Sequence, residues 1–90
     1  MEIYHLKRKD SAGWCEYCDF VVIAESMNIA LDMPPAYNYT KELINWDTSP
    51  SYQDRSSWVS EKSLIDIVHL GSANAEFTER CVICENMRSI

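Results

Sequence analysis

Glycine, proline and long apolar runs are all scarce in this sequence, which has two glycines and three prolines among 90 residues. Without a glycine-rich stretch, it lacks the loop that cradles a phosphate group in nucleotide-binding enzymes. No run approaches the ~20 apolar residues of a membrane helix, and the opening MEIYHLKRKD has no hydrophobic signal core. We therefore expect a cytoplasmic protein with no membrane partner.

Basic residues are also few. Eight Lys and Arg stand against fourteen Asp and Glu, which gives a net charge of −6. Because a basic footprint is missing, we expect no direct binding to nucleic acid. The acidic residues are dispersed, so they fit an ordinary hydrated surface or, as the sharper alternative, a mimic of a nucleic-acid backbone. An acidic balance also speeds association with a basic protein surface.

Apolar and aromatic side chains are abundant. Hydrophobic residues make up 47% of the chain and aromatic residues 11%, a composition too apolar for intrinsic disorder. A chain of this length has room for one core only, so residues 1–90 are expected to form a single domain.

Four segments predict strands. The first is Glu2 to Arg8, and a turn joins it to residues 19–24, whose apolar β-branched run is typical of a central strand buried on both faces. Residues 63–70 and 80–85 predict two further strands, and Gly71 is expected to end the first of these. An exposed edge such as that of residues 80–85 could pair with a second copy across a two-fold axis, giving a homodimer.

One short helix is expected between the two pairs of strands. Ser26 can cap it, and Pro34 and Pro35 stop it after about two turns. Its apolar face would consist of Met27, Ala30, Leu31 and Met33. Residues 36–62 show no clean period, although residues 40–44 could add a helical turn. The predicted fold is α+β, a small four-stranded mixed or antiparallel sheet in the order β-β-α-loop-β-β, with one short helix packed on one face.

The cysteines form two Cys-x-x-Cys pairs, Cys15 with Cys18 and Cys81 with Cys84, a spacing that suits a tetrahedral zinc ion. Residues three apart in a strand point to opposite faces, so Cys81 and Cys84 could not hold one ion without a kink. We therefore expect free thiols and no cofactor. Structural zinc is one alternative, and a disulfide, which a reducing cytosol disfavours, is the other.

Catalytic groups are hard to find. His5 and His69 are the only histidines that could activate a cysteine nucleophile, and each lies mid-strand among apolar neighbours. A packed histidine is the simpler interpretation, and neither a Ser-His-Asp order nor a Glu-His metal spacing is present. We expect the protein not to be an enzyme.

Aromatic residues accompanied by charges occupy the hairpin rim after Gly13 and the irregular middle loop. Trp, Tyr and Arg dominate interface hot spots, because they bury much area and keep a polar tip. The candidate binding residues are Trp14, Glu16, Tyr17 and Asp19 in the rim, and Trp46, Tyr52, Arg55 and Trp58 in the loop. For the three tryptophans, a place in the core or over it is the alternative. The same rings could stack on a nucleobase, with a basic side chain on its phosphate.

The run GWCEYCDFVVIAES, the capped helix after it, and the later IDIVHLGSA and VICENMRS resemble a family of small proteins of bacteriophages and mobile elements. In that family an acidic-aromatic DEYD stretch precedes an apolar strand. Here Cys15 and Cys18 stand where the family has acids, which weakens the zinc alternative because the family folds without those thiols. The resemblance implies a phage-encoded accessory protein in the host cytoplasm, of a class that often occupies a host defence component.

The leading hypothesis is therefore a non-enzymatic inhibitor that binds a host protein, a defence factor, through residues 14–19 and the aromatic middle loop. A sponge that sequesters a nucleotide signalling molecule is the second hypothesis. A zinc-stabilised interaction module is the third.

Overall fold

The computed structural model describes residues 1–11, 16–47 and 58–87. The elements, in chain order, are β1 (Glu2–Arg8), β2 (Tyr17–Ala24), α1 (Met27–Asp32), α2 (Tyr37–Thr40), the 3-10 turn η1 (Lys62–Leu64), β3 (Ile65–Ser72) and β4 (Cys81–Met87). All neighbouring strands run antiparallel, so the predicted α+β fold is confirmed and its sheet is antiparallel, not mixed.

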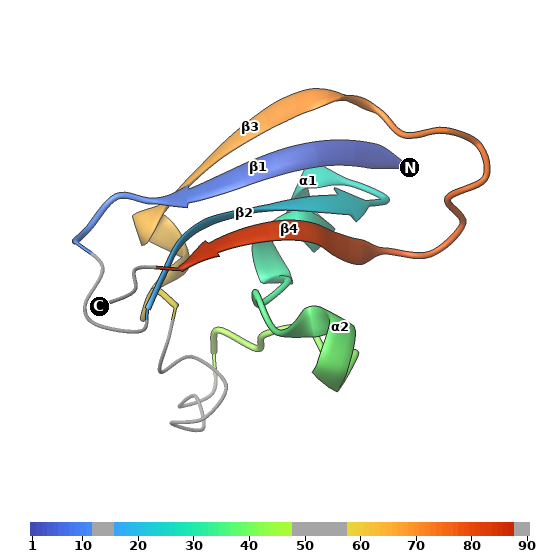
Figure 1. Ribbon diagram of the computed structural model, residues 1–90. Coiled ribbons are helices and arrows are strands. Elements are labelled where there is room, and N and C mark those ends of the chain that lie inside the picture. The colour runs from blue at the N-terminus through green and yellow to red at the C-terminus, as the bar shows by residue number, and fades with distance from the viewer. Residues whose placement is uncertain (12–15, 48–57, 88–90) are drawn as a thin grey trace.

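The strands lie in the spatial order β3-β1-β2-β4 (Figure 1). The β1–β2 hairpin therefore occupies the centre of the sheet, where the apolar run of β2 was predicted to lie. The chain adds β3 beside β1, then crosses through the loop at residues 73–80 to add β4 beside β2. Two strands distant in sequence thus become the two edges of the sheet.

One face of the sheet carries the core. Leu6 pairs with Phe20 in the register of β1 and β2, and both side chains are fully buried. The helices lie together on this side of the sheet (Figure 1), where Ala30 and Met33 are fully buried, and Trp58 meets Phe20 edge to face with the ring centroids 4.8 Å apart. Burying a side chain such as Leu or Phe contributes about 1.5–3 kcal/mol each, so this face supplies most of the stability.

The opposite face corrects the prediction that β2 is buried on both sides. Asp19 and Val21 point to this face and are only half-buried, because no helix of the described residues covers it. Ile23 is the exception at 1% exposure, and its cross-strand neighbours on this face are Ile3 and Cys81. The continuous apolar run of β2 therefore reflects its central position and not a second packed layer.

Helix α1 forms with the predicted cap, but Met27 of its expected apolar face is 42% exposed, and the middle segment differs from the prediction. The hydroxyl of Ser26 accepts a hydrogen bond from the amide of Ile29 at 3.3 Å, as an N-cap should. The extra helical turn lies at Tyr37–Thr40 rather than at residues 40–44, because Lys41 adopts a left-handed conformation (φ 57°) and ends it. Gly71 was expected to end the third strand, but it lies inside β3 with φ 153°.

The two edges of the sheet are protected unequally. On the β4 edge, the side chain of Asn38 donates to the carbonyl of Val82 at 2.8 Å and accepts from its amide at 2.9 Å. Among the described residues, no comparable backbone pairing covers the outer edge of β3. The fourth strand, named above as the edge for a homodimer, is thus blocked at Val82, and β3 is the more open edge.

Candidate binding surface

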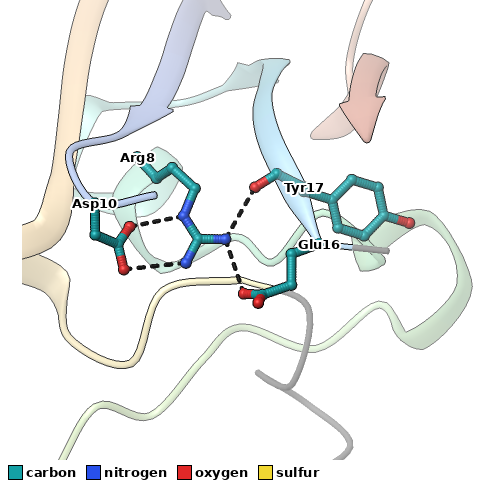
Figure 2. Close-up of polar contacts among 4 residues, drawn as sticks. All are labelled: Arg8, Asp10, Glu16 and Tyr17. Atoms are coloured by element: carbon teal, nitrogen blue, oxygen red, sulfur yellow. Dashed lines mark hydrogen bonds and ion pairs between the residues drawn. The ribbon is translucent and has the colours of Figure 1, made fainter. Parts of the chain in front are cut away.

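Arg8 organises the end of the sheet where the β1–β2 hairpin turns (Figure 2). Its Nε and Nη2 donate to the two carboxylate oxygens of Asp10 at 2.7 and 3.1 Å. Its Nη1 donates to Glu16 at 3.0 Å and to the backbone carbonyl of Tyr17 at 3.2 Å. Arg8 is only 8% exposed, and its guanidinium carbon lies 6.0 Å from the centre of the Trp58 ring. A planar donor with five N–H groups can satisfy all these acceptors at once, so Arg8 fixes both ends of the turn.

The hydrogen bonds of Arg8 also change the pKa of its partner. They lower the pKa of Asp10 below its ordinary value of 3.8, because the guanidinium stabilises the ionised carboxylate. The ion pair therefore holds at neutral pH and keeps the rim residues in place.

Tyr17 connects the rim to two residues that were not predicted to bind a partner, Tyr39 and Glu85. Its ring points away from Arg8 (Figure 2). Burial, the charge of Glu85 and the phenol of Tyr39 raise its pKa above the ordinary value of 10.0. Glu85 comes from β4 and Tyr39 from α2, so three elements meet here. We call Glu16, Tyr17, Tyr39 and Glu85 the acidic-aromatic patch.

Tyr39 is the most exposed large ring of the described chain, at 87%. The sequence holds a signal for it, since Tyr37 and Tyr39 are two apart in a helical turn and cannot share a face. Tyr37 is buried at 7%, which leaves Tyr39 pointing into water. Glu85 could not be found in this way, because its place beside Tyr17 depends on how β4 pairs with β2.

The other predicted binding residues do not join this patch. Asp19 lies on the opposite face of the sheet, 3.5 Å from His5. Trp46 is half-buried against the core, and its indole N–H donates to Asp32 at 2.9 Å. Trp58 is a core residue at 3% exposure, as the alternative prediction for the tryptophans had it. It therefore does not lie on the surface. Trp14, Tyr52 and Arg55 lie outside the described residues.

A second surface feature is an open groove of about 630 Å³ beside Tyr37, between the end of α2 and the loop before β4. Lys41 lies 5.9 Å from the centre of the Tyr37 ring. Arg80 lines the groove and pairs with Glu25, and Glu79 adds a second acid. The groove therefore offers one ring, two cations and two carboxylates, and its volume falls in the range of small-molecule sites.

The cysteines and histidines do not gather into one site in the described part of the chain. Cys18, Cys81 and Cys84 are free, and no three His, Cys, Asp or Glu residues there are grouped to hold a metal ion. Cys15 lies outside the described residues.

The chain matches no protein-family model, no curated protein and no solved structure. In the described residues, no helix is long and apolar enough to cross a membrane.

Proposed function

We propose that this chain is a non-enzymatic binding protein that occupies a protein partner through the acidic-aromatic patch. The observation that carries the proposal is the exposure of Tyr39, at 87%, together with the raised pKa of Tyr17, to which burial, Glu85 and then Tyr39 contribute. A tyrosine held in water on a fixed helical turn is an anchor that loses little conformational freedom on binding. A bound partner would remove that ring from water.

The charges around the rings define the chemistry of the partner. Glu85 contributes its negative charge at Tyr17, Glu16 precedes Tyr17 and pairs with Arg8, and the whole chain carries a net charge of −6. A basic surface on the partner would be attracted over a distance and held by pairing with Glu85. The resemblance to small proteins of bacteriophages supports a host protein as the partner, a defence component, and inhibition by occupancy as the result.

Capture from host lysate with the wild-type chain and two variants tests the proposal. The wild-type chain should retain one stoichiometric partner with a basic surface, and Tyr39→Ala should lose it by at least tenfold, since truncating a hot-spot ring costs about 2 kcal/mol or more. Phe77→Ala is the matched control, because Phe77 is also an exposed ring (48%) but belongs to the loop between β3 and β4 and not to the patch. Phe77→Ala should bind like the wild type.

Two results would contradict the proposal that the partner binds through the acidic-aromatic patch. One is equal capture by Tyr39→Ala and the wild type. The other is binding that salt does not weaken, since an interaction guided by exposed charges declines as ionic strength rises.

The groove beside Tyr37 favours a second candidate function, the sequestration of a nucleotide signal. The ammonium of Lys41 suits a phosphate, and Arg80, which is paired with Glu25, lines the same groove beside Tyr37. Calorimetry against a panel of cyclic nucleotides tests this function. Submicromolar binding that Lys41→Ala weakens, with the ligand recovered intact, would support it, and no heat with any member would exclude these ligands.

A further inference from the structure

A β-bulge in β4 places two cysteines on the same face of the sheet. In the register with β2, Val21 pairs with Cys84, Val22 with Val82 and Ile23 with Cys81. Ile83 is therefore the extra residue, and the alternation of side chains is reset across it. Cys81 and Cys84 would point to opposite faces in a regular strand. Here their partners in β2 are Ile23 and Val21, which both face away from the helices, so the two cysteines share that face.

The same register sets the spacing of the pair. Val21 and Ile23 are two residues apart, which is about 6.6 Å along a strand, and Cys81 and Cys84 lie beside them on β4. Disulfide-linked residues have their Cα atoms roughly 4.4–6.8 Å apart, so the bulge shortens the separation of the pair towards the upper limit of this range. An unbulged strand would hold residues three apart at about 10 Å.

The two thiols differ in their access to water. Cys84 is exposed, whereas Cys81 is half-buried beside Ile23. Both are free thiols. An exposed thiol with a second thiol close behind it is the arrangement in which oxidation of the first is resolved by attack of the second.

We infer that Cys81 and Cys84 form a reversible dithiol site that a peroxide oxidises to an intramolecular disulfide. The Cys84 thiolate attacks one peroxide oxygen, the O–O bond breaks, and Cys84 becomes a sulfenic acid as hydroxide leaves. The Cys81 sulfur then attacks the Cys84 sulfur, the S–O bond breaks, and the Cys81 proton leaves with the oxygen as water. One peroxide is reduced by two electrons, and the two thiols lose two hydrogens. A small-molecule thiol reverses the bond by exchange.

Cys18 provides an internal contrast. It is the extra residue of a separate irregularity in β2, between Tyr17 and Asp19. It precedes Asp19, whereas Val21, the partner of Cys84, follows Asp19. No group of three ligands includes it with Cys81 and Cys84 in the described residues. Among the described cysteines the inferred site is therefore the pair Cys81 and Cys84, and Cys18→Ser leaves it intact.

Mass spectrometry of peroxide-treated native protein tests the inference. Trypsin cleaves after Arg80 and Arg88, so Cys81 and Cys84 fall in one peptide, CVICENMR, that has no other cysteine. After remaining thiols are alkylated, this peptide should appear without alkyl groups and lighter by two hydrogens, and a thiol reductant should restore it. Oxidation of Met87 adds oxygen and is distinguished by its opposite mass change.

The controls decide between the bulged register and a regular one. Native Cys18→Ser should form the bond as the wild type does, whereas Cys84→Ser should lose it completely. If the bond forms in urea but not in the native chain, the two thiols lie on opposite faces and the inference is overturned. Bonds that link separate chains, or sulfinic acid on Cys84 without a bond, would overturn it as well. Circular dichroism confirms that each variant is folded.

Discussion

The carboxamide of Asn38 pairs with the backbone of Val82 as a neighbouring strand would, donating at 2.8 Å and accepting at 2.9 Å. A side chain from α2 thus satisfies both polar groups of one residue on an edge strand. This single contact links the short second helix to the sheet across 44 positions of sequence. It also blocks the point at which another chain could add to β4.

Replacing Asn38 by alanine is expected to lower the free energy of unfolding by about 1–2 kcal/mol, because two hydrogen bonds are lost and water replaces them only in part. Urea denaturation measures the change. Asn28→Ala is the control, since Asn28 is exposed on α1 and alanine favours a helix. A loss in the control as large as that of Asn38→Ala would contradict the role given to the pairing.

Arg8→Met should destabilise the fold by about 2 kcal/mol. Removing one partner from a fully buried ion pair costs about 3–5 kcal/mol, and the effect here is smaller because Asp10 and Glu16 remain partly in water. Thermal unfolding of the variant and the wild type measures this loss of stability. Lys7→Met, at the adjacent exposed position of β1, should change stability by less than about 0.5 kcal/mol.

The Arg8–Asp10 pair also predicts a dependence on pH. The pKa of Asp10 is lower in the folded chain than in the unfolded one, so its contribution is fully present above 3.8 and is lost as the pH falls through the lower folded pKa. NMR titration of the Asp10 carboxyl should find this low pKa in the wild type. In Arg8→Met the pKa should return towards 3.8, and an unchanged pKa would show that another group stabilises the carboxylate.

Tyr17 tests whether the acidic-aromatic patch is assembled as described. Burial, then Glu85, then Tyr39 raise its pKa, so Glu85→Gln should lower the Tyr17 pKa towards 10.0, the value of an ordinary tyrosine. Titration of labelled tyrosine by NMR follows the ring directly. Because the folded pKa is the higher one, the stability linked to Tyr17 is full below the unfolded pKa of 10.0 and is lost as the pH rises through the higher folded pKa.

Glu79→Gln is the matched control for this titration, since Glu79 lies in the loop at the other end of the sheet. It should leave the Tyr17 pKa where the wild type has it. If both variants move the pKa equally, the shift reflects the net charge of the chain and not the patch.

Metal removal should leave the fold unchanged. Since the described cysteines do not form a group of three ligands, a chelator is expected to leave the Tm within error of the untreated protein. Elemental analysis of the purified chain is the companion measurement. About one zinc per chain together with a lower Tm after chelation would support the zinc-stabilised module instead.

The strand predictions succeeded where a local pattern was strong. The β-branched run of β2 and the Ser26 cap of α1 both form as expected, because each depends on residues a few positions apart. The predicted helical turn at residues 40–44 failed, since the left-handed backbone of Lys41 ends α2 there.

Only some of the predicted binding residues come together in the structure, and the reasons are physical. Glu16 and Tyr17 lie in the acidic-aromatic patch, but Trp58 fills the core beside Phe20. A ring next to a predicted strand can turn inward or outward, and only the packing around it decides which. Tyr39 and Glu85 complete the patch, and they influence the pKa of Tyr17 only because β4 pairs with β2 and α2 packs against β4.

By itself, the amino-acid sequence determined the class of fold, the four strands and the capped helix, since these follow from periodicity and from capping within short windows. Only the tertiary structure decided which strands became edges, that Asn38 closes one of them, and that Cys81 and Cys84 share a face. Strand order and a bulge depend on pairing between distant segments, where one extra residue, Ile83, resets every side chain beyond it.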